Sequence, residues 1–202
     1  MQGQAAGWVL AAVGLIVWSG CSCSGVPSAA EGPKLDPGEV ASAAMTQVDT
    51  SGDGQLDEKE LAKCPPLLAA LSRIDTNEDN KISADEISGR VTAWMASEAA
   101  LVSGAMRVTL DNEPLEGATV TFVPEPFLGD AYQSCSGTSD ASGSVVVEGP
   151  DEDNPGMIYL GFYRVEVTGG SKTIPKRYNE QTELGFEAAI DASTDGFDLS
   201  SE

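Results

Sequence analysis

Two acidic segments of twelve residues follow each other closely in the sequence, DTSGDGQLDEKE at residues 49–60 and DTNEDNKISADE at residues 75–86. In each segment, oxygen-bearing side chains occupy positions 1, 3, 5, 9 and 12, and the last is a glutamate. Such a loop can wrap a hard cation, because position 7 adds a backbone carbonyl and the glutamate at position 12 supplies two oxygens. The spacing therefore predicts two calcium sites, with Ca²⁺ as the only cofactor.

The two loops differ in ways that affect affinity. The predicted ligands of the first loop are Asp49, Ser51, Asp53, the carbonyl of Gln55, Asp57 and Glu60, and those of the second are Asp75, Asn77, Asp79, the carbonyl of Lys81, Ser83 and Glu86. At position 6, where the chain turns sharply, the first loop has Gly54 and the second has Asn80. Asparagine tolerates the left-handed conformation less well than glycine does. The first loop also carries four side-chain carboxylates among its ligands, against three in the second, so we expect the first site to bind calcium more tightly.

Helices are predicted on both sides of each loop. A helix should begin at Pro37, after the capping residue Asp36, and run into the first loop. Position 9 of each loop is three residues before a glutamate, which is the spacing of a capping box, so each loop also starts a helix. The first of these helices should end near Cys64, because prolines follow, and the next should cover residues 66–74. The last should cover residues 85–101, with its apolar stripe of Ile87, Val91, Trp94 and Met95 in the core.

This arrangement of helices and loops resembles the EF-hand family over residues 36–101. The apolar residues at position 8, Leu56 and Ile82, agree with the resemblance, which implies that the loops lie side by side and pair through a short strand. Two loops that both match the ligand pattern are far more specific than one. The resemblance implies that both loops bind calcium.

From residue 105 the pattern changes from helical to alternating, which places a domain boundary near residues 102–104. Strands are predicted at residues 106–110, 119–123, 134–138, 144–148, 162–168, 185–190 and 196–199, with turns rich in Gly, Asp, Asn and Pro between them. Seven short strands predict an antiparallel β-sandwich over residues 105–202. The fold class expected for the whole chain is therefore α+β, with a helical domain followed by the sandwich.

Three stretches of this second half resemble the carboxypeptidase regulatory-like (transthyretin-like) β-sandwich: PLEGATVTF at 114–122, TSDASG at 138–143 and GFYRV at 161–165. The later IPKRYN at 174–179 and TEL at 182–184 resemble the variant in planctomycete-type exported lipoproteins. Such sandwiches are usually accessory modules without fixed chemistry. The resemblance implies a module that contacts another protein or a glycan.

Composition excludes several functions. The net charge of −21, from 32 acidic and 11 basic residues, repels nucleic acid. The 202 residues include no histidine, which rules out catalytic triads and histidine-ligated zinc within this chain. The clustered acids are already assigned to the two loops, and the second half offers no nucleophile with a partner base. We therefore expect a protein that is not an enzyme.

The first 21 residues read as an export signal. An apolar run from Trp8 to Trp18 is followed by Ser19-Gly20-Cys21, which resembles a bacterial lipoprotein signal with Cys21 as the lipidated residue. An ordinary cleaved signal and an uncleaved anchor are the alternatives. Residues 22–35 have the composition of a flexible tether. We expect an exported protein, periplasmic or on the cell surface and held to a membrane, in which Cys64 and Cys135 are either free thiols or a disulfide.

Three functions are compatible with these features. The first is a binding protein in which calcium acts as a structural staple, since extracellular calcium modules have dissociation constants of about 0.1–1 mM and saturated sites stabilise a fold by linkage. The second is a calcium sensor that opens an apolar groove for a target helix. The third is an accessory subunit of an extracytoplasmic enzyme. The sequence favours the staple, because it contains few methionines and short linking helices.

Overall fold

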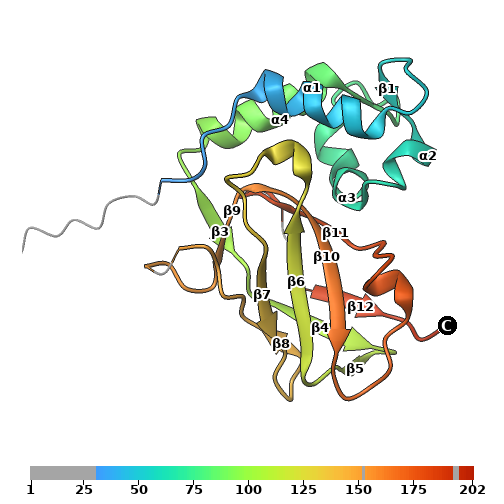
Figure 1. Ribbon diagram of the computed structural model, residues 1–202, viewed down its shortest axis with the longest axis vertical. Helices are drawn as coiled ribbons and strands as arrows, with labels where there is room; N and C mark the ends of the chain where they lie inside the picture. The colour runs from blue at the N-terminus through green and yellow to red at the C-terminus, as the bar shows by residue number, and fades with distance from the viewer. Residues whose placement is uncertain (1–30, 152, 193–195) are drawn as a thin grey trace, which may run out of the picture.

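A computed structural model describes residues 31–151, 153–192 and 196–202. The chain forms a helical half that lies over a larger half made mostly of strands, so the fold is a mixed α+β arrangement (Figure 1). The predicted signal, Cys21 and residues 22–30 of the tether lie outside the described residues. Within the described ranges, none of the helices combines the length and the apolar character that crossing a bilayer requires.

The helical half contains α1 (Pro37–Val48), α2 (Glu58–Leu61), α3 (Pro65–Ile74) and α4 (Ala84–Ala96). The predicted start of α1 is confirmed, because the Asp36 carboxylate accepts hydrogen bonds from the N–H groups of Gly38 and Glu39, both at 2.9 Å. The capping boxes that start α2 and α4 are also confirmed. We call α1, the first loop and α2 the first hand, and α3, the second loop and α4 the second hand.

Two helices are shorter than predicted. α2 ends at Leu61, because Cys64 must leave the helical conformation to precede Pro65. α4 ends at Ala96 and not at residue 101, since Glu98 has a left-handed conformation with φ of 58° that a helix cannot include.

The predicted apolar stripe of α4 is correct at three of its four positions. Ile87, Val91 and Trp94 are buried, whereas Met95 is 55% exposed. Neighbouring residues on a helix point about 100° apart. Met95 therefore faces solvent when the adjacent Trp94 faces the core.

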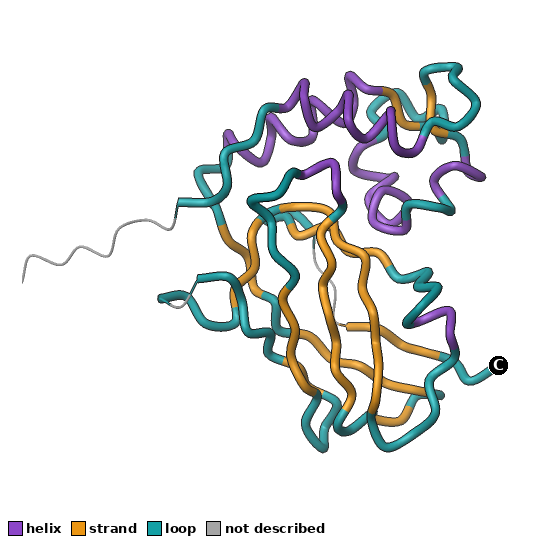
Figure 2. Tube along the Cα trace, viewed as in Figure 1, coloured by secondary structure: helices purple, strands orange, loops and turns teal. Residues whose placement is uncertain are grey.

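The other half is built from two four-stranded sheets and one two-stranded pair (Figure 2). The first sheet has the order β11-β10-β6-β7, the second has β12-β4-β5 with β8 also on β4, and β3 pairs with β9. The strands are β3 (Leu101–Ser103), β4 (Met106–Leu110), β5 (Glu113–Pro114), β6 (Ala118–Pro124), β7 (Cys135–Thr138), β8 (Ser144–Val145), β9 (Met157–Tyr159), β10 (Gly161–Gly169), β11 (Gly185–Ala188) and β12 (Gly196–Leu199). Two 3₁₀ turns, η1 (Pro126–Leu128) and η2 (Lys176–Tyr178), lie in the connections.

This half differs from the predicted seven antiparallel strands in two respects. The described residues from 101 onward contain ten strands, because β3, β5 and β9 have two or three residues and are too short for alternation to reveal them. The prediction of a purely antiparallel arrangement is wrong, since β12 runs parallel to β4, with Gly196 opposite Arg107 and Leu199 opposite Leu110. A parallel partner is chosen by the path of a long connection, which local sequence patterns do not contain.

The core runs without a break from one half to the other. Alternate residues of β6, namely Ala118, Val120 and Phe122, are fully buried, as the alternating pattern predicts. Between the halves, the ring of Trp94 from α4 lies 4.7 Å from the ring of Phe162 on β10. The helices and the sheets therefore share one hydrophobic cluster.

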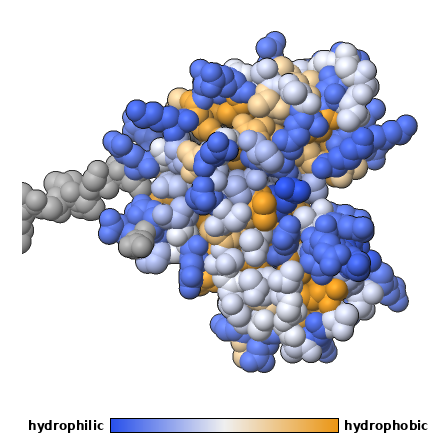
Figure 3. All heavy atoms as spheres, viewed as in Figure 1, coloured by the Kyte–Doolittle hydropathy of each residue, from blue (hydrophilic) through white to orange (hydrophobic). Residues whose placement is uncertain are grey.

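The face shown in Figure 3 has hydrophilic residues projecting along the edges of both halves, with smaller hydrophobic areas between them.

Candidate calcium sites

The two loops lie side by side and are joined by a short ladder. β1 (Gln55–Leu56) pairs antiparallel with β2 (Ile82–Ser83), which places Leu56 directly opposite Ile82. Both side chains are fully buried. The pairing predicted from position 8 is confirmed.

Inside each loop, the first acidic residue organises the turn. One Asp49 carboxylate oxygen accepts from the Gly52 N–H at 2.6 Å, and the other accepts from the Gly54 N–H at 3.0 Å. In the second loop, Asp75 accepts from the Asn80 N–H at 2.8 Å, at the position equivalent to Gly54. The carboxylate at position 1 thus accepts from the backbone N–H at position 6 in both loops.

The middle of each loop repeats the same pattern. Asp53 accepts from the Gln55 N–H and Asp79 accepts from the Lys81 N–H, both at 2.9 Å. At position 3, Asn77 accepts from the Asp79 N–H at 2.9 Å, and Ser51 accepts at the equivalent place at 3.4 Å. The second loop has therefore adopted the conformation of the first, although position 6 is not glycine.

The glutamates at position 12 fold back over the start of their loops. Glu60 accepts from the Thr50 N–H at 2.9 Å and from the Thr50 hydroxyl at 3.2 Å, while Glu86 accepts from the Thr76 N–H at 3.0 Å and its hydroxyl at 3.3 Å. The second oxygen of each glutamate accepts from the backbone N–H at position 9, at 3.1 Å from Asp57 and 2.9 Å from Ser83. Both carboxylates are buried, so each ties the start of its loop to the beginning of the leaving helix.

These hydrogen bonds lower the pKa of three of the loop carboxylates. The N–H groups of Gly52 and Gly54 lower the pKa of Asp49, and those of Ser51 and Asp57 lower the pKa of Glu60. Burial alone would raise the pKa of Glu86, but hydrogen bonds from Ser83 and Thr76 outweigh it, so its pKa is also below the ordinary value. These three carboxylates are therefore ionised at neutral pH, as a carboxylate that binds calcium must be.

The backbone at position 4 is a feature that the sequence prediction missed. Gly52 in the first loop has φ of 75°, and Glu78 at the same position of the second loop has φ of 61°. Position 6 is also left-handed in both loops, with φ of 81° at Gly54 and 62° at Asn80. The second loop thus has non-glycine residues at the two positions where the first has glycines. Aligning the two loops position by position reveals this difference in the sequence.

The residues of the two loops fit calcium. Among the described residues, no three acidic or cysteine side chains are grouped closely enough to hold a metal ion. The predicted donors are all hard oxygens, and they line two loops whose backbone turns are already formed. The first ion would be held by the side chains of Asp49, Ser51, Asp53, Asp57 and Glu60 and by the Gln55 carbonyl. The second ion would be held by the equivalent positions of the loop at 75–86.

Comparison with known proteins identifies these loops. Residues 42–65 and 68–89 match the family model described as EF hand. The chain contains an EF-hand. An EF-hand suggests calcium binding, which is consistent with the prediction of Ca²⁺ as the cofactor, whereas the role of each ligand remains a prediction. The matched stretches stop at residue 89, and the resemblance predicted for the β half has no support from the comparisons.

The other two comparisons contribute no relatives. No curated protein and no solved structure matches the chain. The assignment of the EF-hand therefore rests on the family model and on the loop geometry described above.

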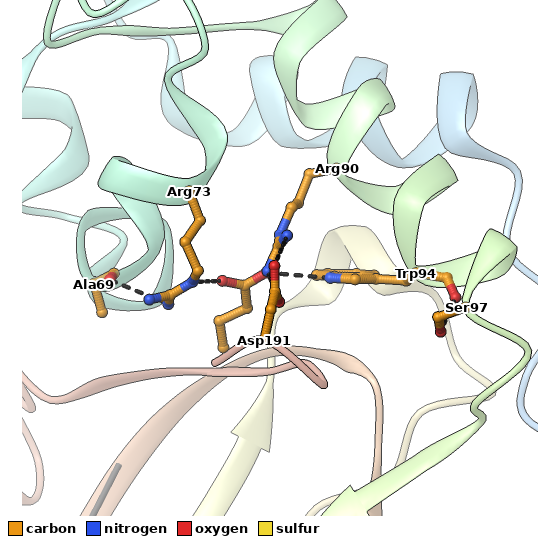
Figure 4. Close-up of polar contacts among 7 residues, drawn as sticks. Ala69, Arg73, Arg90, Trp94, Ser97 and Asp191 are labelled. Atoms are coloured by element: carbon orange, nitrogen blue, oxygen red, sulfur yellow. Dashed lines mark hydrogen bonds and ion pairs between the residues drawn. The ribbon is translucent and has the colours of Figure 1, made fainter. Parts of the chain in front are cut away.

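The EF-hand pair is docked on the β half through polar contacts that the sequence did not suggest. The Glu187 side chain on β11 is fully buried and accepts from Arg73 Nε at 2.6 Å, Arg90 Nε at 2.5 Å and Trp94 Nε1 at 3.1 Å. Arg90 also makes two hydrogen bonds to Asp191, at 2.8 and 2.6 Å. Figure 4 shows Arg73, Arg90 and Trp94 pointing from the helices toward the side where Asp191 lies. We call these residues the Glu187 cluster.

Proposed function

We propose that this is an exported, non-enzymatic calcium-binding protein in which bound calcium stabilises the fold and does not transmit a signal. The observation that supports this most is the Glu187 cluster, in which both helices of the second hand are held by one buried carboxylate. A sensor must separate its helices and expose an apolar groove when calcium binds. Here Trp94 and α3 already pack against the β half, so such opening would break a buried ionic network.

The test is thermal unfolding of the full chain with excess calcium and with a chelator. Calcium binds the folded loops and not the unfolded chain, so it should raise the midpoint with increasing concentration. The matched control is the double variant Glu60→Gln with Glu86→Gln, whose midpoint should no longer respond to calcium. Equal midpoints of the unaltered chain in calcium and in chelator would disprove the structural role.

A sensor would give a different result in a second measurement. Binding of an apolar probe dye should not increase when calcium is added if calcium only stabilises the docked hands. A large calcium-dependent increase in dye binding would favour the sensor, the alternative that the sequence left open.

Export and anchoring form a separate part of the proposal. The supporting observation is the apolar run that ends at Ser19-Gly20-Cys21 in the sequence. If Cys21 is lipidated, labelling cells with a radioactive fatty acid should mark the protein, and Cys21→Ser should abolish the label while Cys23→Ser keeps it. Label retained in Cys21→Ser would disprove lipidation at this residue.

The β half is proposed to be a sandwich of the carboxypeptidase regulatory-like kind that contacts a protein or a glycan. Its two sheets enclose a common set of buried residues, among them Val108, Phe122 and Val165, which supports a two-layer arrangement. A pull-down and a glycan array with the full chain would identify the partner. Specific retention of neither a protein nor a glycan would contradict an interaction module.

A further inference from the structure

The two EF-hands contact the β half through equivalent positions. Gln47 and Arg73 each lie two residues before the first residue of their loop, on the entering helix. Cys64 and Arg90 each lie fifteen residues after it, beyond the end of the loop. In both hands, these two positions face one buried glutamate of the β half.

In the second hand the glutamate is Glu187. Arg73 on α3 and Arg90 on α4 donate to its two different oxygens, so the carboxylate bridges the two helices that flank the loop. The Glu187 side chain is inaccessible to solvent, and Arg90 is only 9% exposed. Water does not reach the carboxylate itself, which makes the geometry of these contacts costly to change.

In the first hand the glutamate is Glu125, which directly follows β6. Gln47 Nε2 donates to Glu125 at 2.9 Å, and the Cys64 thiol interacts with the same carboxylate. Glu125 is 2% exposed, and Arg164 of β10 lies 3.4 Å from it. The groups of the first hand that contact Glu125 are a neutral amide and a neutral thiol, whereas the second hand contacts Glu187 through two arginines. The first hand is therefore held less strongly than the second.

Close packing of the backbone accompanies these polar contacts. Gly185 on β11 lies against Pro65 at the start of α3, and a Cβ at position 185 would overlap the Pro65 carbonyl group. The start of α3 can therefore lie this close to β11 only because residue 185 has no side chain. The position of α3 is fixed by the strand as well as by Arg73.

From these contacts we infer that the β half acts as a built-in clamp, which sets the spacing of the two helices of the second hand and so makes its loop ready for calcium. This inference rests on the proposed calcium binding. Calcium would join positions 1 and 12 of the loop, and Glu187 joins the same two helices at positions just outside it. Calcium and Glu187 therefore both act on the distance between α3 and α4. With Glu187 bound to both helices, the turns of the loop are already formed.

Because linkage is reciprocal, the clamp and calcium strengthen each other. Releasing the clamp leaves α3 and α4 free to separate, so calcium must then restrict a more mobile pair of helices. Calcium affinity at one of the two sites should therefore fall when Glu187 is neutralised. By the same reasoning, chelating calcium should loosen the contact between Trp94 and the β half.

The first test is calorimetric calcium titration of the full chain and of Glu187→Gln. The variant should still bind two calcium ions, with affinity at one site reduced on the order of tenfold, within the range of about 5- to 150-fold typical of coupled sites. Asp191→Asn should give a smaller decrease, because Asp191 is 59% exposed and contacts only Arg90 of the second hand. It also keeps the test valid if Glu187→Gln does not fold.

The control is Glu113→Gln, which neutralises a glutamate paired with Lys172 on the surface, away from the hands. Its calcium affinities should equal those of the unaltered chain. If the unaltered chain binds calcium and both Glu187→Gln and Asp191→Asn bind it equally well or better, the clamp is disproved while calcium binding stands. If the unaltered chain binds none, the proposed function itself fails.

The second test follows Trp94 directly. In a full chain carrying Trp8→Phe and Trp18→Phe, Trp94 is the only tryptophan. Its emission should shift to longer wavelength on chelation, because the indole loses its contacts with Glu187 and Phe162. The shift should already be present in Glu187→Gln with calcium, and emission unaffected by chelation would contradict the coupling.

Discussion

Leu56 and Ile82 lie directly opposite each other in the ladder that joins the two calcium loops, and neither side chain is exposed to solvent. Each residue occupies position 8 of its loop, between the predicted calcium ligands at positions 7 and 9. The pair therefore joins the two loops directly. It also contributes to the core of the helical half.

Ile82→Ala should destabilise the calcium-saturated protein by about 2–5 kcal/mol, because removing a buried Ile side chain leaves a cavity. Denaturant unfolding in excess calcium measures this loss. Ile190→Ala is the matched control, since Ile190 is 60% exposed and its truncation should change stability by about 0.5 kcal/mol or less. A loss at Ile82 no larger than at Ile190 would contradict the packing described here.

The first loop should bind calcium more tightly than the second. Glu78 and Asn80 occupy left-handed positions that cost on the order of 1 kcal/mol each, whereas the first loop has glycines there. Glu78→Gly should therefore strengthen the second site by up to about fivefold, measured by titration of a Glu60→Gln background in which only that site remains. As a matched opposite change, Gly52→Ala in a Glu86→Gln background should weaken the first site.

Acid should affect the loops and Glu125 in opposite ways. Glu60 has a pKa below its ordinary value of 4.5, so its stabilisation is complete above about pH 4.5 and is lost as the pH falls through the folded-state pKa. Burial raises the pKa of Glu125, so its charged form destabilises the fold at higher pH, and that penalty diminishes as the pH falls toward 4.5. In calcium-free buffer, Glu125→Gln should be more stable than the unaltered chain near pH 8, and the difference should shrink near pH 5.

The control for this comparison is Glu113→Gln. Lys172 lowers the pKa of Glu113, so its contribution should stay constant over the same range and should not grow with pH. A stability difference for Glu125→Gln that does not depend on pH would show that the carboxylate keeps an ordinary pKa in the folded protein.

Cys64 and Cys135 are free thiols, and both are buried. Burial raises the pKa of the Cys64 thiol above its usual range, and it raises that of Cys135 to about 11. Neither forms an appreciable amount of thiolate at neutral pH, so a maleimide should label neither until the protein unfolds. Mass spectrometry of each cysteine-containing peptide checks this, and rapid labelling of Cys64 in the folded protein would contradict its position against Glu125.

The sequence was sufficient for the features that depend on short-range spacing. The repeated loops, the caps at Asp36, Asp57 and Ser83 and the pairing of Leu56 with Ile82 follow from residues at most a few positions apart within each hand. The alternation of Val120 and Phe122 likewise predicted β6. Each of these features has a local physical cause that the sequence displays directly.

The remaining features depend on residues far apart in the chain. Glu187 follows Arg90 by 97 residues, and nothing in the local pattern of β11 distinguishes it from an exposed glutamate on a strand. Glu98 gives no signal of its left-handed conformation, so the sequence predicts an end of α4 that is too late. The sequence also does not predict the parallel partner of β12, because this partner depends on the route of the whole connection.

The parallel pairing of β12 with β4 also affects the order in which the protein can fold. Gly196 lies opposite Arg107, so this sheet cannot be completed until nearly ninety further residues have been synthesised. The hands, by contrast, are built from contacts within about sixty residues, and such local structure forms early. The helical half should therefore be structured while β4 still has an unpaired edge, and that edge is where aggregation would begin if synthesis or secretion stopped short of residue 196.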